Sequence, residues 1–210
     1  MDLTTTQKRE LFSTLTHAAG SLVAVVGLVV LVVIASQQGD LWKIVSFSVY
    51  GATLVLLYTF SSCYHGLTGL PKRIFRYCDH TAIFLLIAGT YTPFTLVTLK
   101  GAWGWSIFGA VWGLALVGIV VDFFYHNKKR LLPILVYVLM GWMIIIALGP
   151  LLRALPTSGF LWLLAGGLLY TGGLVFYGLD KKLWPAHGIW HLFVLGGSIC
   201  HYVTVLVYVA

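Results

Sequence analysis

Seven runs of apolar residues, each long enough to cross a lipid bilayer, follow one another with only short connections between them. A helix needs about 20 mostly apolar residues to span the hydrocarbon core. Of the 210 residues, 60% are hydrophobic and 9% are charged, whereas soluble domains carry about 25% charged residues. A water-soluble fold could not hide this much apolar surface. The sequence therefore predicts an integral membrane protein without a separate soluble domain.

We expect an all-α bundle of seven transmembrane helices that forms one domain over residues 1–210, with a short cytoplasmic N-terminal segment, 1–16. The first run has no cleavable signal before it and six more runs after it, so we interpret it as a retained helix. The predicted spans are Ala18–Ala35, Ile44–Tyr64, Thr81–Leu99, Trp103–Val121, Leu132–Leu148, Gly159–Tyr177 and Gly188–Val209. Within the fourth span, Gly109 and Gly113 form a G-x-x-x-G pair, a weak signal for close helix packing.

Basic residues predict the orientation, because loops rich in Lys and Arg stay in the cytoplasm. One set of connections holds three of the thirteen, namely Lys43, Lys100 and Arg153. The alternate set holds ten: Lys8, Arg9, Lys72, Arg73, Arg76, Lys128, Lys129, Arg130, Lys181 and Lys182. We therefore expect the N-terminus inside and the C-terminus outside. This scatter in short clusters also explains the net charge of +7 without a nucleic-acid partner.

Ionisable residues in or near membrane spans are costly and by default suggest function. The chain has seven histidines and six acidic residues. In the predicted topology, most of them fall at the cytoplasmic ends of five spans: His17, His65, Asp79, His80, Asp122, His187 and His191. The sequence thus predicts one polar layer at the inner rim of the bundle.

His187 and His191 are spaced i, i+4 at the start of the last span, so their rings lie on one helix face. Two imidazoles at this spacing can bind one metal ion. The pair alone leaves a second interpretation equally open, namely two interfacial histidines in contact with headgroups or water. No Glu lies between them, so this is not the H-E-x-x-H pattern of metalloproteases.

His65 at the end of the second span is a candidate third ligand, with Ser61 one turn before it on the same face. Asp79 begins the third span at the same depth as His65. Three neutral imidazoles with a nearby carboxylate are typical of a catalytic zinc site with an open fourth position. Asp79 is the best candidate for a general base, and its alternative role is the N-cap of the third span.

His80, His17 and Asp122 are candidates for residues around the ligands, although each also suits an ordinary interfacial position. His80 points about 100° away from Asp79 around the helix. His201 lies about 21 Å from His187 along the helix axis, too far to bind the same ion.

These residues belong to a longer pattern. It consists of Thr16-His17-x-x-Gly20, Ser61-x-x-x-His65, Asp79-His80 followed by the segment 88–93, and His187-x-x-x-His191. In this pattern the chain resembles the hemolysin III family, within the progestin and adiponectin receptor superfamily and the wider group that includes alkaline ceramidases.

The resemblance implies a seven-helix bundle with an intracellular N-terminus. It also implies zinc held by His65, His187 and His191, with Asp79 contacting a water at the ion and Ser61 beside it. Adiponectin receptors and ceramidases are associated with hydrolysis of lipid amides, while bacterial members are named for haemolysis and are linked to membrane-lipid homeostasis. The absence of a long region before the first span favours the compact bacterial form, in the cytoplasmic membrane.

The leading hypothesis is a zinc-dependent hydrolase of lipid amide or ester bonds at the cytoplasmic leaflet, with membrane lipids as its partners. The alternative is a non-enzymatic protein, either a pore-forming cytolysin or a regulator of membrane lipids and energetics. The spans show no polar stripe to line a wide pore. The last span has no Lys for a retinal Schiff base, whereas a proton-coupled transporter and a homo-oligomer both stay open.

Overall fold

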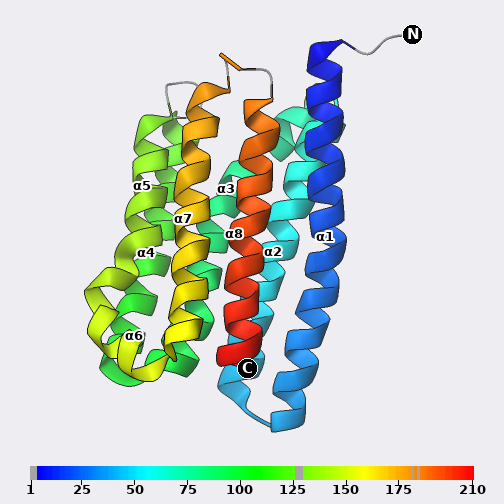
Figure 1. Cartoon of the computed structure of the whole chain (residues 1–210). Helices are drawn as coiled ribbons and strands as arrows, with labels where there is room; N and C mark the ends of the chain where they lie inside the picture. Colours follow the sequence, from blue (N-terminus) through cyan, green and yellow to red (C-terminus); the bar gives the residue numbers. More distant parts are fainter. Residues whose placement is uncertain (1–3, 126–129, 181, 184) are drawn as a thin grey trace.

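Seven helical spans run side by side, as the apolar runs predict (Figure 1). The computed structural model describes residues 4–125, 130–180, 182–183 and 185–210. Within these ranges, seven helices are long and apolar enough to cross a membrane. The two chain ends lie at opposite ends of the bundle, as an odd number of spans requires. The predicted all-helical fold is confirmed, and the chain is a multi-pass membrane protein.

The first helix, α1 (Thr5–Gln38), begins well before the predicted Ala18. Thr4 and Gln7 form a capping box, in which each side chain accepts a hydrogen bond from the other residue's backbone N–H. Such a box satisfies two of the donors left free at a helix start. His17 consequently lies inside α1 and not at its start.

A tight turn joins α1 to α2 (Leu41–Gly66). Gly39 ends α1 with φ of 66°, a left-handed conformation that glycine adopts without strain. Asp40 then caps α2, because its carboxylate accepts from the backbone N–H of Trp42 at 2.9 Å.

The third span changes its helical geometry at a proline. The α-helical part, α3 (Gly69–Pro93), continues as a π-helix, η1 (Phe94–Leu99). Proline has no backbone N–H and cannot donate to the preceding turn. Lys100 has φ of 51° and turns the chain into α4 (Gly101–Tyr125).

The fifth span consists of three helical pieces, α5 (Leu131–Trp142), the 3₁₀ segment η2 (Met143–Ala147) and α6 (Leu148–Ala154). It therefore extends past the predicted end at Leu148. Tyr91 of α3 explains the interruption, because its hydroxyl accepts from the N–H of Ile144 at 2.9 Å and donates to the carbonyl of Gly141 at 3.0 Å. A side chain inserted in this way replaces the regular backbone ladder.

The last two spans, α7 (Thr157–Leu179) and α8 (Ala186–Tyr208), approach each other closely. A Cβ on Gly197 of α8 would lie 2.7 Å from the ring of Tyr170 on α7, so only glycine fits there. In Figure 1, α8 stands between α7 and α1. This position brings the start of α8 close to the end of α2, where the predicted ligands lie.

Candidate metal centre

Three histidines meet at the end of the bundle that also holds the N-terminus. His65 comes from the last turns of α2, and His187 and His191 come from the first turns of α8. One ring nitrogen from each residue lies within 4.8 Å of the others. All three are buried, with exposed fractions of 6%, 9% and 2%. The structure thus brings together the three residues that the sequence marked as metal ligands.

The separation of the ring nitrogens suits one ion. Zn–N bonds of 2.0–2.1 Å in a tetrahedron place neighbouring ligand atoms roughly 3.3–3.4 Å apart. Nε2 of His187 lies 3.3 Å from Nε2 of His65. The histidine cluster is therefore compatible with a metal site.

A carboxylate behind His65 determines where the proton of that imidazole lies. The Nδ1–H of His65 donates to Oε2 of Glu10 at 2.8 Å. Because a carboxylate only accepts, the Nε2 of a neutral His65 ring keeps its lone pair, which faces Nε2 of His187 at 3.3 Å. Asp180 lies 3.4 Å from Nδ1 of His187, which has no hydrogen-bond partner among the described residues. A ring with a carboxylate on Nδ1 and a bare Nε2 is the usual arrangement of a metal-binding histidine.

Glu10 and Asp180 were not among the residues singled out from the sequence. Each has a basic partner, since Lys72 lies 3.2 Å from Glu10 and Arg9 lies 2.9 Å from Asp180. Glu10 precedes His17 by two helical turns, so a helix drawn from Thr5 would have placed both on one face. The predicted first span begins only at Ala18, so Glu10 falls in the N-terminal segment 1–16, for which no helix is predicted.

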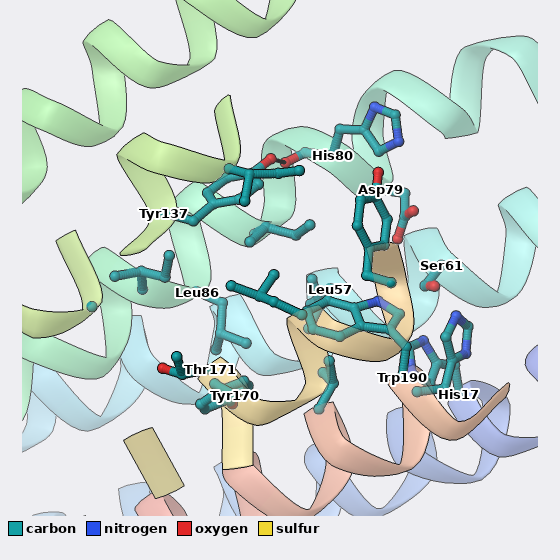
Figure 2. Close-up of a pocket in the computed structure, with 18 of the residues that line it drawn as sticks. His17, Leu57, Ser61, Asp79, His80, Leu86, Tyr137, Tyr170, Thr171 and Trp190 are labelled. Carbon is teal, nitrogen blue, oxygen red and sulfur yellow. Dashed lines mark hydrogen bonds between the residues drawn. The ribbon is translucent and has the colours of Figure 1, made fainter. Parts of the chain in front are cut away.

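Ser61 and Asp79 lie together beside the histidines. Their side chains are joined by a hydrogen bond, and the charge of Asp79 interacts with His65. Both line the cavity described below (Figure 2). The alternative role of Asp79 as an N-cap is wrong, because α3 begins at Gly69 and its N-cap is Thr68. Asp79 sits inside the helix, and its carboxylate is free for another role.

His80 and Asp122 form a second polar group next to the histidine cluster. Nη2 and Nε of Arg130 donate to Oδ1 of Asp122 at 2.7 and 3.1 Å, and Nδ1 of His80 lies 3.7 Å from Oδ2. Arg130 also donates to the hydroxyl of Tyr137, which donates to the carbonyl of His80. This network ties α3, α4 and α5 together, and neither His80 nor Asp122 belongs to the three-histidine set.

His17 borders the cluster from α1. Its ring stacks on that of His191 with centroids 3.7 Å apart and planes 19° apart, and it meets Tyr58 edge-on at 5.1 Å. Among the described residues neither ring nitrogen of His17 has a hydrogen-bond partner. His201, by contrast, lies deep in α8 and bonds to the carbonyl of Leu163 at 3.1 Å.

A cavity of about 290 Å³ leads from the histidines into the bundle. Figure 2 shows Asp79, His80 and Ser61 on one part of its wall and Leu57 and Leu86 on another. Most of its lining is apolar. The site therefore joins a polar end that suits a metal ion to an apolar space that suits a hydrocarbon chain.

Comparison with known proteins finds similar sequences that match over most of this chain. The family model described as "Haemolysin-III related" matches residues 5–202. "Hemolysin-3" of Bacillus cereus is 44% identical over 204 residues, which cover 96% of this chain and 92% of that protein. "Hemolysin-3 homolog" of Bacillus subtilis is 45% identical over 204 residues, covering 97% and 95%. "Monocyte to macrophage differentiation factor" of Homo sapiens is 28% identical over 199 residues, covering 92% and 81%.

Proposed function

The chain belongs to the haemolysin-III-related family, and we propose that in this member His65, His187 and His191 hold a zinc ion that serves hydrolysis of a lipid amide or ester. One observation carries the proposal: a ring nitrogen from each of three buried histidines lies within 4.8 Å of the others, and Glu10 on Nδ1 of His65 leaves the Nε2 of that ring bare. Histidine nitrogens in this geometry suit zinc, and three such ligands leave a fourth position open.

A zinc ion in such a site supplies Lewis acidity, which polarises a carbonyl and lowers the pKa of water. Asp79 is the residue that moves protons. Its carboxylate accepts a proton from the attacking water and returns it to the leaving nitrogen or oxygen of the lipid. The Ser61 hydroxyl interacts with that carboxylate and would orient it for this transfer. These two side chains and the three imidazoles make up the proposed site.

The cavity supports a lipid as substrate. Its walls beyond Asp79 include Leu57, Leu86 and Val194, which favour a hydrocarbon chain over a polar one. An acyl chain in this space would leave its carbonyl next to the histidine cluster. A filled cavity would also exclude bulk water from the far side of the site.

We further propose that this end of the bundle faces the cytoplasm. The cluster lies with Arg9, Lys72 and Arg130 at one end, and all three belong to the set of ten basic residues that the positive-inside rule assigns to the inner side. The substrate would then come from the cytoplasmic leaflet of the cell membrane.

Turnover of defined lipids by purified protein tests the proposal. The zinc-loaded protein is incubated in detergent with an N-acylsphingosine, an N-acylethanolamine and a phospholipid ester, and free fatty acid is measured. We expect release from at least one amide or ester, lost on chelation and in His187→Ala. A protein that holds zinc but releases fatty acid from none of these lipids would contradict the hydrolase.

The name of the Bacillus cereus relative, "Hemolysin-3", favours a second candidate function, lysis of membranes. If the chain lyses membranes through a pore and not through the site, dye release from liposomes should be equal for wild type and His187→Ala. Dye release that disappears together with fatty-acid release would instead make lysis a result of lipid hydrolysis.

A further inference from the structure

The first three turns of α1 carry polar residues on the face that packs against the histidine cluster. The buried face of α1 follows a helical stripe, which is apolar or small from Gly20 to Ala35 but polar at Ser13 and His17. Glu10 continues the stripe one turn earlier. Polar residues therefore occur on this face only where α1 passes the cluster, within the part of α1 that the structure describes.

Each of the three imidazoles has a neighbour that lies on α1 or is bound by α1: a carboxylate near Nδ1 of His65 and of His187, and a ring stacked on the face of His191. Glu10 accepts from Nδ1 of His65 at 2.8 Å. Arg9 binds both carboxylate oxygens of Asp180, at 2.9 and 3.1 Å, and Asp180 lies 3.4 Å from Nδ1 of His187. His17 stacks on His191.

The chemistry of metal-binding histidine explains why such contacts matter. A carboxylate on Nδ1 fixes the tautomer, orients the ring and makes Nε2 more basic, so that its loss costs roughly 10–100-fold in metal affinity. Glu10 is well suited to this role, because the Oε2 atom that accepts from His65 also lies 3.2 Å from Nζ of Lys72, which holds the carboxylate in place. Arg9 and Glu10 are adjacent in sequence, yet they serve different histidines on different helices.

We infer that the start of α1 is part of the metal site, with Glu10 as the positioning residue of His65 and with Arg9 as the positioning residue of His187 through Asp180. The inference rests on the proposed metal site and goes beyond its three ligands. It assigns to the N-terminal turns of α1 the task of keeping the rings of His65 and His187 directed at one ion.

Zinc affinity of purified full-length variants tests the inference, measured by competition with a chelator of known affinity. We expect Glu10→Ala to bind zinc 10–100-fold more weakly than wild type. Glu10→Gln keeps an acceptor oxygen but no charge, so it should recover part of that loss. Arg9→Ala should weaken binding less than Glu10→Ala, because it acts through Asp180. Asp40→Asn is the matched control for Glu10→Gln, because it also replaces a carboxylate with an amide, but at the far end of the bundle. Asn caps a helix as well as Asp does, so the fold should be unaffected.

The visible spectrum of bound Co²⁺ is a second readout, which keeps the test decisive if Glu10→Ala does not fold. Glu10→Gln should shift the absorption of Co²⁺, because the basicity of His65 changes, while Asp40→Asn should not. The inference would be overturned if the Glu10 variants bound zinc as tightly as wild type and left the Co²⁺ spectrum unchanged. It would also be overturned if Glu10→Gln and Asp40→Asn lost zinc affinity to the same extent. A wild type that binds no zinc would refute the proposed function itself, a result distinct from both.

Discussion

The Nε2 atoms of His65 and His187 lie 3.3 Å apart, although 122 positions of sequence separate the two residues. The contact joins the last turns of α2 to the first turn of α8. Glu10 accepts from Nδ1 of His65, which leaves the Nε2 lone pair of that ring directed at His187, and Asp180 lies 3.4 Å from Nδ1 of His187. The chemistry proposed for the site depends on this one relationship.

Asp79 should be needed for turnover and not for metal binding. Asp79→Asn keeps the shape of the side chain but cannot accept a proton, so we expect fatty-acid release to fall roughly 10²–10⁴-fold. Zinc content should stay at the wild-type level. Full turnover in Asp79→Asn would show that the base is another group.

Ser61→Ala should slow the reaction by a smaller factor. A hydrogen bond to a charged group contributes about 1.5–3 kcal/mol, which corresponds to a loss of roughly tenfold or more when Asp79 is no longer held. Ser61→Thr retains the hydroxyl and is the control. If Ser61→Ala released fatty acid as fast as wild type, Ser61 would have no role in the reaction.

The packing of α1 on α2 should not tolerate a methyl group at Gly51. A Cβ there would lie 3.0 Å from the Cα of Leu28, which is backbone and cannot move aside. Overpacking of this kind costs about 1–3 kcal/mol, so Gly51→Ala should lower the unfolding temperature in detergent. Gly109→Ala and Gly113→Ala are controls, because no atom in the described part of the chain lies within 4 Å of a Cβ at either position. Equal unfolding temperatures for Gly51→Ala and both controls would contradict the close packing.

The ion pair of Asp122 and Arg130 should be coupled energetically. Their side chains are 4% and 11% exposed, and removing one partner of a buried pair costs about 3–5 kcal/mol. Asp122→Leu alone should therefore destabilise the protein strongly, and adding Arg130→Met should restore most of the loss. If the double variant unfolds at the temperature of the single one, the two residues are not coupled.

The hydropathy pattern was sufficient to predict the spans, because each must be apolar over its full width. The three histidines were predictable for a related reason, since orientation placed them at one depth and the i, i+4 spacing placed His187 and His191 on one face. Close helix packing at Gly109 and Gly113 did not appear among the described residues. A spacing motif alone does not say which face of a helix meets a neighbour.

The helix ends and their contacts were less predictable. Outside the hydrocarbon layer helices need not be apolar, so hydropathy did not show that α1 starts at Thr5 or α3 at Gly69. Glu10 was missed for this reason. The sequence also leaves open that Asp79 caps a helix, although it lies inside α3. The insertion of Tyr91 into the fifth span depends on tertiary packing, which no local pattern reveals.

Cysteine labelling tests the proposed orientation. In a variant whose three native cysteines are replaced by alanine, Arg73→Cys lies at the cluster end and Lys100→Cys at the opposite end, and both positions are exposed. A membrane-impermeant maleimide added to intact cells should modify Lys100→Cys and leave Arg73→Cys unmodified. The reverse pattern would place the site on the outer side.

Metal analysis of purified wild type beside His65→Ala, His187→Ala and His191→Ala tests the central claim most directly. Because the three imidazoles bind together, we expect about one zinc ion per wild-type chain and almost none in each variant. A wild type that carries no zinc, or a His65→Ala variant that carries as much as wild type, would contradict the metal site.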